Sequence, residues 1–249
     1  MRYFYTLHIL CLLMFSSSLS AAEVPATVSW ADVRQLGLPL SGVIKSINKQ
    51  SGSYVKTGEA ILSLNCGFYN AQFNQKKAIA EGLLPAVERT LKDKDLAVEL
   101  FERTVLSEIE LRNAELIYIE TKSKYDAAKA ESDEKKWHVD NCNLIADSHL
   151  IVLELHASVG EVISLETTRP VLATVASREK MSATAVVALP LKKNYKPGKK
   201  LKVDVFGKIY DGKIVSVIYN SDSSAELVAE FNVFDPRLIT SKSAKLIIE

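Results

Sequence analysis

The sequence lacks the short motifs that mark the common enzyme classes. It contains no Gly-x-Ser-x-Gly around a nucleophilic serine, no glycine-rich phosphate-binding loop and no histidine spacing of a metalloprotease. Neighbouring carboxylates occur only in a highly charged helical segment, where a solvated helix face explains them. We therefore predict that the protein is not an enzyme and has no catalytic residue.

An excess of charge of either sign is also absent. The chain has 31 basic and 30 acidic residues, a formal net charge of +1, so composition gives no indication of a nucleic-acid partner. Beyond the first 22 residues, no stretch approaches the ~20 consecutive apolar residues that a membrane-spanning helix needs. The 249 residues are enough for one large domain or for two to three small ones.

The N-terminal segment has the pattern of an export signal. One arginine precedes an apolar core at residues 7–15, and the small residues Ser20 and Ala22 lie at the positions that signal peptidase requires before Glu23. We expect residues 1–22 to be a cleaved signal peptide, which makes the mature protein periplasmic. A retained membrane anchor is the alternative.

Two separated stretches each look like half of a small β-domain. Residues 42–64 contain the strands "GVIKSI" and "AILSL" with glycine turns between them. Strands are also predicted at residues 150–155 and 171–175, with "SVGEVI" between them. Because the order of strand, glycine turn, valine, second turn and strand recurs, and neither half could close a core alone, we predict that both fold into one β-sandwich.

The segment between the halves is strongly helical. Residues 68–137 hold 12 basic and 14 acidic residues among 70, and Gly82 and Pro85 are their only helix breakers. We expect two antiparallel arms, each roughly 45–55 Å long at 1.5 Å per residue. Pro85 should kink or break the first arm, since proline removes a helical hydrogen bond and crowds the preceding turn.

Apolar residues spaced by seven predict a coiled coil between the arms. The turn is expected at "RTVLSE", where Ser107 would be the N-cap of the second helix and Glu110 its capping-box partner. Lys94 interrupts the first seam. The predicted seam residues are Leu84, Val87, Leu91, Val98, Phe101 and Val105 in the first arm, and Ile109, Leu116 and Ile119 in the second.

The C-terminal region reads as several short strands separated by Pro, Gly and Asn-Ser turns, which favours a small β-barrel. The predicted fold class is therefore α+β, elongated and multidomain. Its parts are a sandwich from residues 23–66 and 138–177, a helical hairpin at 67–137 and a barrel at 178–249.

This order of parts resembles the periplasmic adaptors of tripartite export pumps, the membrane fusion protein family. "SGVIKSINKQSGSYVKTGEAILSL" and "VGEVIS" resemble the two halves of that family's biotinyl/lipoyl-like domain. "LSEIELRNAE" resembles its descent from the hairpin tip, and "KPGKKLKVDV" and "YDGKIVSV" its barrel strands.

The resemblance implies a non-catalytic protein that links an inner-membrane transporter, of RND or ABC type, to an outer-membrane efflux duct, as a homo-oligomeric ring and without a cofactor. The lipoyl carriers present a modified lysine between their halves, but here helices occupy that junction, so covalent cofactor attachment is not expected.

The resemblance also implies which tip residues contact the duct. Family members that dock on a duct have an Arg, a Leu four residues later and a Ser seven residues after that. Leu100 and Ser107 fit this pattern, but Leu96 stands at the Arg position. The expected duct contacts are Leu100, Arg103, Thr104 and Ser107.

Of the three cysteines, Cys11 lies in the expected signal peptide, which leaves Cys66 and Cys142. Export to an oxidising compartment favours pairing. In the fold that the resemblance implies, the two residues are neighbours at the base of the hairpin, so we predict a Cys66–Cys142 disulfide.

A metal site is the alternative interpretation of these residues, because Cys142 lies among His138, His149 and His156 in the sequence. However, His149 and His156 are seven apart on a strand pattern, so they point to opposite faces. Two other functions therefore stay open: a periplasmic metal-delivery adaptor, and an exported coiled-coil protein that acts without a pump.

The run "LKKNYKPGKKLK" places six lysines between Lys192 and Lys202. A solvated loop is the simplest interpretation. Contact with an anionic membrane surface or an acidic transporter face is the alternative.

Overall fold

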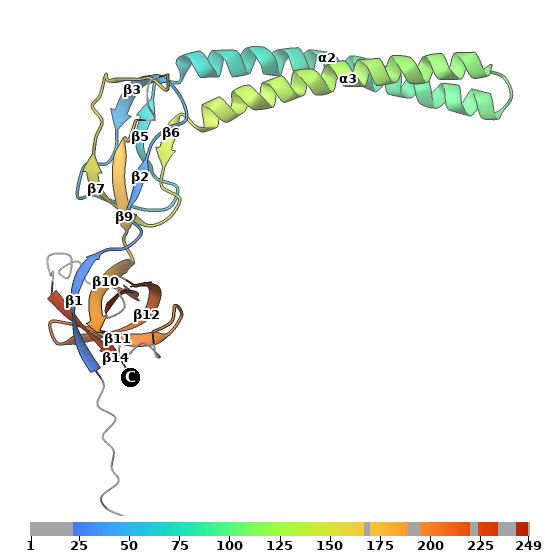
Figure 1. Cartoon of the computed structure of the whole chain (residues 1–249). Coiled ribbons are helices and arrows are strands. Elements are labelled where there is room, and N and C mark those ends of the chain that lie inside the picture. Colours follow the sequence, from blue (N-terminus) through green and yellow to red (C-terminus); the bar gives the residue numbers. More distant parts are fainter. Residues whose placement is uncertain (1–21, 167–169, 189–194, 220–223, 234–242, 249) are drawn as a thin grey trace, which may run out of the picture. The chain divides into compact units, whose positions relative to one another are not determined.

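The computed structural model describes residues 22–166, 170–188, 195–219, 224–233 and 243–248. It divides the chain into two compact units, shown in Figure 1. One unit is Arg34–Val175, and the other comprises the described parts of Met1–Val33 and Ala176–Glu249. Residues 1–21, which hold most of the expected signal peptide, lie outside the described residues.

The unit Arg34–Val175 contains two four-stranded sheets, and each sheet combines strands from before and after the helices. Gly42 pairs with Ile163 in one sheet, and Tyr54 pairs with Ile151 in the other. The two separated stretches therefore form a single two-sheet unit. The strands of the first sheet are, in order, β2 (Arg34–Leu36), β9 (Ala173–Ser177), β7 (Leu150–Leu155) and β4 (Tyr54–Val55). Those of the second are β6 (Asn143–Ile145), β5 (Ala60–Leu64), β3 (Gly42–Ile47) and β8 (Val162–Ile163).

The core of this unit is shared by both stretches. Ile44, Val55 and Ile61 from the first stretch pack in one cluster with Val152 and Val175 from the second, and each is at most 1% exposed. Full burial of such a side chain stabilises a fold by about 1.5–3 kcal/mol. Neither stretch could bury these residues without the other.

Two long helices connect β5 to β6, which are neighbouring strands of the same sheet. Helix α2 (Gly67–Glu102) and helix α3 (Glu108–Asp140) contact each other along their lengths, and together with residues 103–107 we call them the hairpin. Helix α2 is continuous through Pro85, so the predicted break is wrong. The proline removes one hydrogen bond, while the bonds on either side and the packing against α3 hold the helix together.

The contact between the helices differs from the predicted seam. Ile109, Leu116 and Ile119 are 73%, 54% and 57% exposed, so their assignment to the seam is wrong. The buried and half-buried residues of α3 include two other seven-residue series: Leu111, Tyr118, Tyr125 and Ser132, and Ala114, Thr121, Ala128 and Lys135.

On α2, Lys94 is part of the contact that it was expected to interrupt. Its Nζ lies 5.1 Å from the centre of the Tyr118 ring on α3. Ala80, Thr90 and Ala97 are the buried residues of α2. The contact therefore combines small and polar residues with half-buried larger ones such as Leu91 and Leu111, whereas Ile109, Leu116 and Ile119 are mostly exposed.

The second unit is a closed six-stranded barrel, as predicted. Val203, Ile214, Leu227 and Leu246 are completely buried in its core. Among the described residues, no helix is long and apolar enough to cross a bilayer. The strand order is β1 (Ala22–Trp30), β10 (Lys180–Ala188), β13 (Ser224–Asn232), β12 (Lys208–Tyr219), β11 (Lys200–Val205) and β14 (Ser243–Ile248).

Strand β1 corrects the predicted domain boundary. Residues 23–66 were expected in the sandwich, but β1 pairs with β10 at Val28↔Ala183 and with β14 at Val24↔Leu246. Ala26 and Val28 of β1 are buried in the barrel core. Without this strand, β10 and β14 would be left with open edges.

Candidate functional site: the tip and base of the hairpin

A tight turn forms the tip of the hairpin. Ser107 is the N-cap of α3, and its Oγ accepts a hydrogen bond from the Glu110 backbone N–H at 3.3 Å. The Glu110 carboxylate in turn accepts from the Ser107 N–H at 2.9 Å and from its hydroxyl at 2.6 Å. These hydrogen bonds lower the pKa of the Glu110 carboxyl. The predicted capping box is therefore confirmed.

The four predicted duct-contact residues lie together in this turn but differ in their exposure and in the contacts that they make. Leu100 is half-buried, and its carbonyl accepts the Val105 N–H at 2.9 Å. Arg103 is exposed and pairs with Glu99. Thr104 is exposed with φ 60°, a conformation that non-glycine residues rarely adopt. Thus Leu100 and Ser107 build the turn, while Arg103 and Thr104 face solvent.

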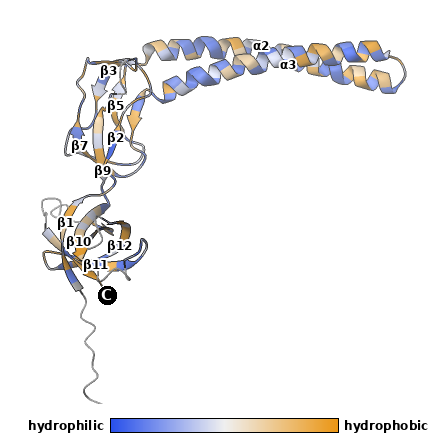
Figure 2. Cartoon of the chain, in the orientation of Figure 1, coloured by the Kyte–Doolittle hydropathy of each residue, from blue (hydrophilic) through white to orange (hydrophobic). Residues whose placement is uncertain are grey.

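Exposed aliphatic and aromatic residues gather in the half of each helix that leads to the tip, and Figure 2 shows hydrophobic residues along this part of both ribbons. Clusters of this kind mark interaction surfaces more often than isolated exposed residues do. The sequence did not reveal this cluster, because the seven-residue spacing assigned several of its members to the helix contact. The residues are Leu96, Phe101, Val105, Ile109, Leu116, Ile117 and Ile119.

A disulfide closes the base of the hairpin. Cys66 is the N-cap of α2 and Cys142 follows α3, with Sγ atoms 2.24 Å apart and Cα atoms 6.1 Å apart. The Leu64 N–H also donates to the Cys142 carbonyl at 2.9 Å. The structure therefore contains the predicted pair, and it ties the N-cap of α2 to a residue just beyond the end of α3.

The histidines near Cys142 are engaged separately. His138 packs edge-on against Tyr69, with ring centres 5.5 Å apart, and His156 Nε2 lies 3.0 Å from Thr174 Oγ1. Among the described residues, no three His, Cys, Asp or Glu side chains come together as metal ligands. The sulfur of Cys142 belongs to the disulfide. The described residues around it therefore contain no cluster of ligands for the alternative interpretation, a metal site.

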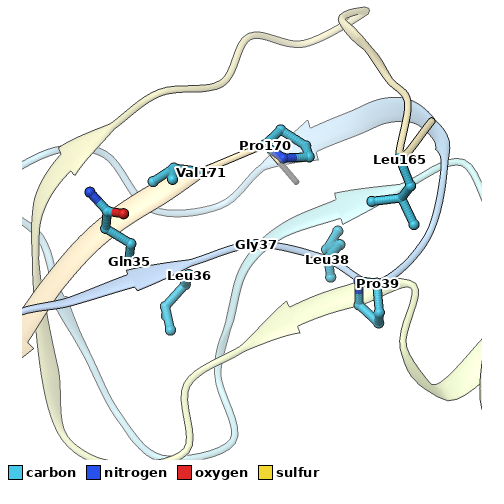
Figure 3. A pocket seen from close by; sticks show the side chains of 8 residues that line it. All are labelled: Gln35, Leu36, Gly37, Leu38, Pro39, Leu165, Pro170 and Val171. Atoms are coloured by element: carbon cyan, nitrogen blue, oxygen red, sulfur yellow. The ribbon is translucent and has the colours of Figure 1, made fainter. Parts of the chain in front are cut away.

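A hollow of about 680 Å³ lies in the two-sheet unit, and Figure 3 shows its lining. Gly37 lies so close to Pro170 that an added Cβ would be 2.6 Å from the Pro170 carbonyl oxygen. The described residues that line the hollow are apolar except for Gln35. The lining consists of Gln35, Leu36, Gly37, Leu38, Pro39, Leu165, Pro170 and Val171.

The lysine run lies partly in the barrel. Lys192 and Lys193 are outside the described residues, whereas Lys200 and Lys202 are exposed on β11. Lys200 is directly opposite Lys213 of β12, an arrangement of like charges that costs free energy in an antiparallel sheet. Lys202 is opposite Asp211, and Lys213 is opposite Glu230 on its other side, so this part of the barrel carries charges of both signs.

Sequence comparisons give no lead to the family: protein-family models and curated protein sequences both yielded no match. Comparison with solved structures is informative. The membrane fusion protein Spr0693 from Streptococcus pneumoniae R6 superposes with a TM-score of 0.65 at 13% identity, over 92% of this chain and 99% of that one. The chain has the fold of the membrane fusion proteins.

Two further structures share this membrane fusion protein fold. MacA from Actinobacillus actinomycetemcomitans gives a TM-score of 0.65 at 17% identity, over 92% of this chain and 78% of that one. A MacA–MexA chimera with the Pseudomonas aeruginosa MexA α-hairpin domain gives 0.60 at 16% identity, over 92% and 80%. Because the identities are this low, the likeness is one of fold.

Proposed function

We propose that the protein is a periplasmic adaptor that links an inner-membrane transporter, of RND or ABC type, to an outer-membrane efflux duct. The observation that carries this proposal is the shared fold over 92% of the chain with a membrane fusion protein. In this role the chain performs no chemistry. It couples two membrane proteins and seals the path between them.

The hairpin is suited to reach a distant partner. Its first helix has 36 residues, a length of ~54 Å at 1.5 Å per residue. The exposed Arg103 and Thr104 and the surrounding apolar side chains would meet the duct, with Leu100 and Ser107 holding the turn in shape. Because the disulfide ties both helices at their base, a displacement there would be passed to the tip.

The barrel would contact the inner-membrane side of the system. Its exposed lysines, including Lys200 and Lys202, suit the acidic face of a transporter or an anionic membrane surface. Several copies are needed to enclose a conduit, so we propose a ring of identical subunits. The partner transporter would supply the energy for transport.

Two features support the proposed periplasmic location. Residues 1–22 match a signal peptide, and a disulfide is expected to persist in an oxidising compartment. Intact-mass measurement of the protein purified from its host would distinguish cleavage before Glu23 from a retained anchor.

Site-specific photo-crosslinking in the native host tests the proposal. A photoreactive residue at Thr104 should capture an outer-membrane protein, and one at Lys200 an inner-membrane transporter. A probe at Lys124, exposed in the middle of α3, is the matched control and should capture neither. If neither end captures a membrane protein, the proposed function is wrong.

A further inference from the structure

We propose that the Cys66–Cys142 disulfide is a site of thiol–disulfide exchange, at which a dithiol protein of the oxidoreductase class opens and closes the base of the hairpin. This inference goes beyond the proposed function, because it adds a partner that acts on the disulfide itself. The bond is then a switch between a tied and an untied hairpin, and the hollow beside it admits the thiol of the partner.

Both cysteines line one hollow at the base of the hairpin. It measures about 480 Å³, and its lining also includes residues of β3, β5 and both helices. One water molecule occupies ~30 Å³ in the liquid, so the hollow has room for the cysteine side chain of another protein. Cys142 is 1% exposed, whereas Cys66 is half-buried. Cys66 is therefore the cysteine that an incoming thiol reaches first.

The lining of this hollow favours an anion. The attacking species in thiol–disulfide exchange is a thiolate, which is negatively charged. Lys45 lines the hollow, is exposed and takes part in no ion pair with any described residue. None of the described lining residues is acidic, so an approaching thiolate meets a cation and no repelling carboxylate. The uncharged polar side chains of the lining are Ser46, Ser63, Asn65, Asn70 and Asn143.

The position of Cys66 in the fold favours the open form of the pair. Cys66 is the N-cap of the 36-residue helix α2, and its side chain makes no capping hydrogen bond while it is tied to Cys142. The first backbone N–H groups of a helix have no partner within the helix, and they stabilise an anion at this end. A freed Cys66 thiolate can accept these hydrogen bonds. Stabilisation of the reduced form makes a disulfide easier to reduce.

The exchange takes two balanced steps. In the first, the thiolate of the partner attacks Cys66 Sγ, a mixed disulfide forms, and the Cys66–Cys142 bond breaks. Its electron pair passes to Cys142 Sγ, which takes a proton from water. In the second step, the other thiolate of the partner attacks the partner's sulfur in the mixed disulfide and releases Cys66 as a thiolate. This chain has then gained two electrons, and the partner leaves as a disulfide.

Opening unties the two helices but leaves other contacts at the base in place. The Leu64 N–H donates to the Cys142 carbonyl at 2.9 Å, and the Tyr69 hydroxyl donates to the Ser41 carbonyl at 2.7 Å. The unit therefore stays folded, while α2 and α3 lose the covalent link between their ends. In the adaptor role, the untied hairpin passes less of a displacement from its base to its tip. This last consequence alone rests on the proposed function.

Reduction of the folded protein tests the proposal. The full chain, with Cys11→Ser and its disulfide intact, is treated with thioredoxin as the dithiol probe, and the free thiols are alkylated and counted by mass spectrometry. We expect the same rate constant without urea and in 1 M urea, because the hollow is open in the folded protein. A disulfide that is reached only by unfolding would be reduced about fivefold faster or more in 1 M urea. An increase of that size would overturn the proposal.

Trapping identifies the sulfur that is attacked. Thioredoxin in which serine replaces the second active-site cysteine cannot complete the exchange, so the mixed disulfide accumulates. Digestion and mass spectrometry should find the probe on Cys66. A probe found mainly on Cys142, or no mixed disulfide at all, would overturn the proposal.

Charge reversal tests the route through the hollow, with dithiothreitol as a small probe. Lys45→Glu places a carboxylate beside the incoming thiolate and should slow reduction about threefold to tenfold at low salt. Lys124→Glu is the matched control: it changes the net charge equally, on the exposed middle of α3, and should leave the rate unchanged. About 1 M salt should remove most of the difference. Equal effects of the two substitutions would show that the thiolate does not enter through the hollow.

The failure of this inference can be told apart from failure of the proposed function. If the probes at Thr104 and Lys200 capture their membrane proteins but the folded chain resists thioredoxin, only the exchange is wrong. If thioredoxin opens the disulfide and neither probe captures a membrane protein, the exchange stands and the proposed function is wrong.

Discussion

Removal of the Cys66–Cys142 disulfide gives a sharp test of how the hairpin is anchored. The two cysteines are 76 residues apart in the sequence. In the chain-entropy description, a cross-link closing a loop of this length stabilises the folded state by up to ~4.5 kcal/mol. Alanine is the suitable replacement, because Cys142 is 1% exposed and a serine hydroxyl would be buried there without a partner.

The expected loss is confined to one unit. Cys66→Ala with Cys142→Ala should lower the free energy of unfolding of the unit Arg34–Val175 by about 2–4 kcal/mol in urea. Hydrogen exchange should speed up by tens- to hundreds-fold at the first turn of α2 and the last turn of α3. The barrel serves as an internal control, because its core is separate.

Two outcomes would contradict this reasoning. The first is a double variant that unfolds within about 1 kcal/mol of the native protein, which would mean that the disulfide does not constrain the loop. The second is an equal acceleration of exchange in the barrel, which would mean that the two units do not unfold separately. Reduction of the native protein with a dithiol should reproduce the behaviour of the double variant.

Three further predictions concern single sites. Pro85→Ala should stabilise the hairpin against urea by up to about 3 kcal/mol, because the missing helical hydrogen bond can form; Gly82→Ala, whose added methyl group would have open space, should give only about 0.5–1 kcal/mol. Ser107→Ala should remove the capping box and cost about 1 kcal/mol, whereas Ser107→Thr should retain most of it; equal losses in both would show that the cap is not the cause. Asp147 accepts two hydrogen bonds from the Arg34 guanidinium, at 2.7 and 2.9 Å, which lower the pKa of its carboxyl. Since the folded-state pKa is the lower one, its stabilisation is present above about pH 4 and is lost as the pH falls through the folded-state value. Asp147→Asn should therefore reduce stability at pH 7 and by progressively less as the pH falls below about 4, and an effect that does not change with pH would refute an electrostatic cause.

Much of the fold could be predicted from local patterns. Strands β3, β5 and β7 begin and end where the alternation of apolar and polar residues placed them. The turn at Gly52 has φ 84°, which explains why glycine is needed there. The capping box at Ser107 was also recognisable, because it depends on two residues only three positions apart.

Features that depend on distant partners were not predictable in the same way. β1 has an ordinary strand pattern, and nothing within it reveals that its neighbours lie more than 150 residues further on. In α3, the seven-residue spacing of Ile109 and Leu116 was real, but periodicity does not say which face meets α2. Ile109 and Leu116 are more than half exposed, whereas Leu111 of the same helix is half-buried.

The position of β1 has a consequence for how the chain is made. The first strand of the barrel bonds to the last, at Ala26↔Ala244, and everything in the unit Arg34–Val175 is synthesised between them. Because the N-terminus is synthesised first, the two-sheet unit and its hairpin can fold before the residues near the C-terminus are made. Until then β1 can pair with at most one of its two neighbours. A chain truncated before β14 would have an open barrel, although its two-sheet unit could still fold. We therefore expect proteases to degrade a chain that lacks the final strand.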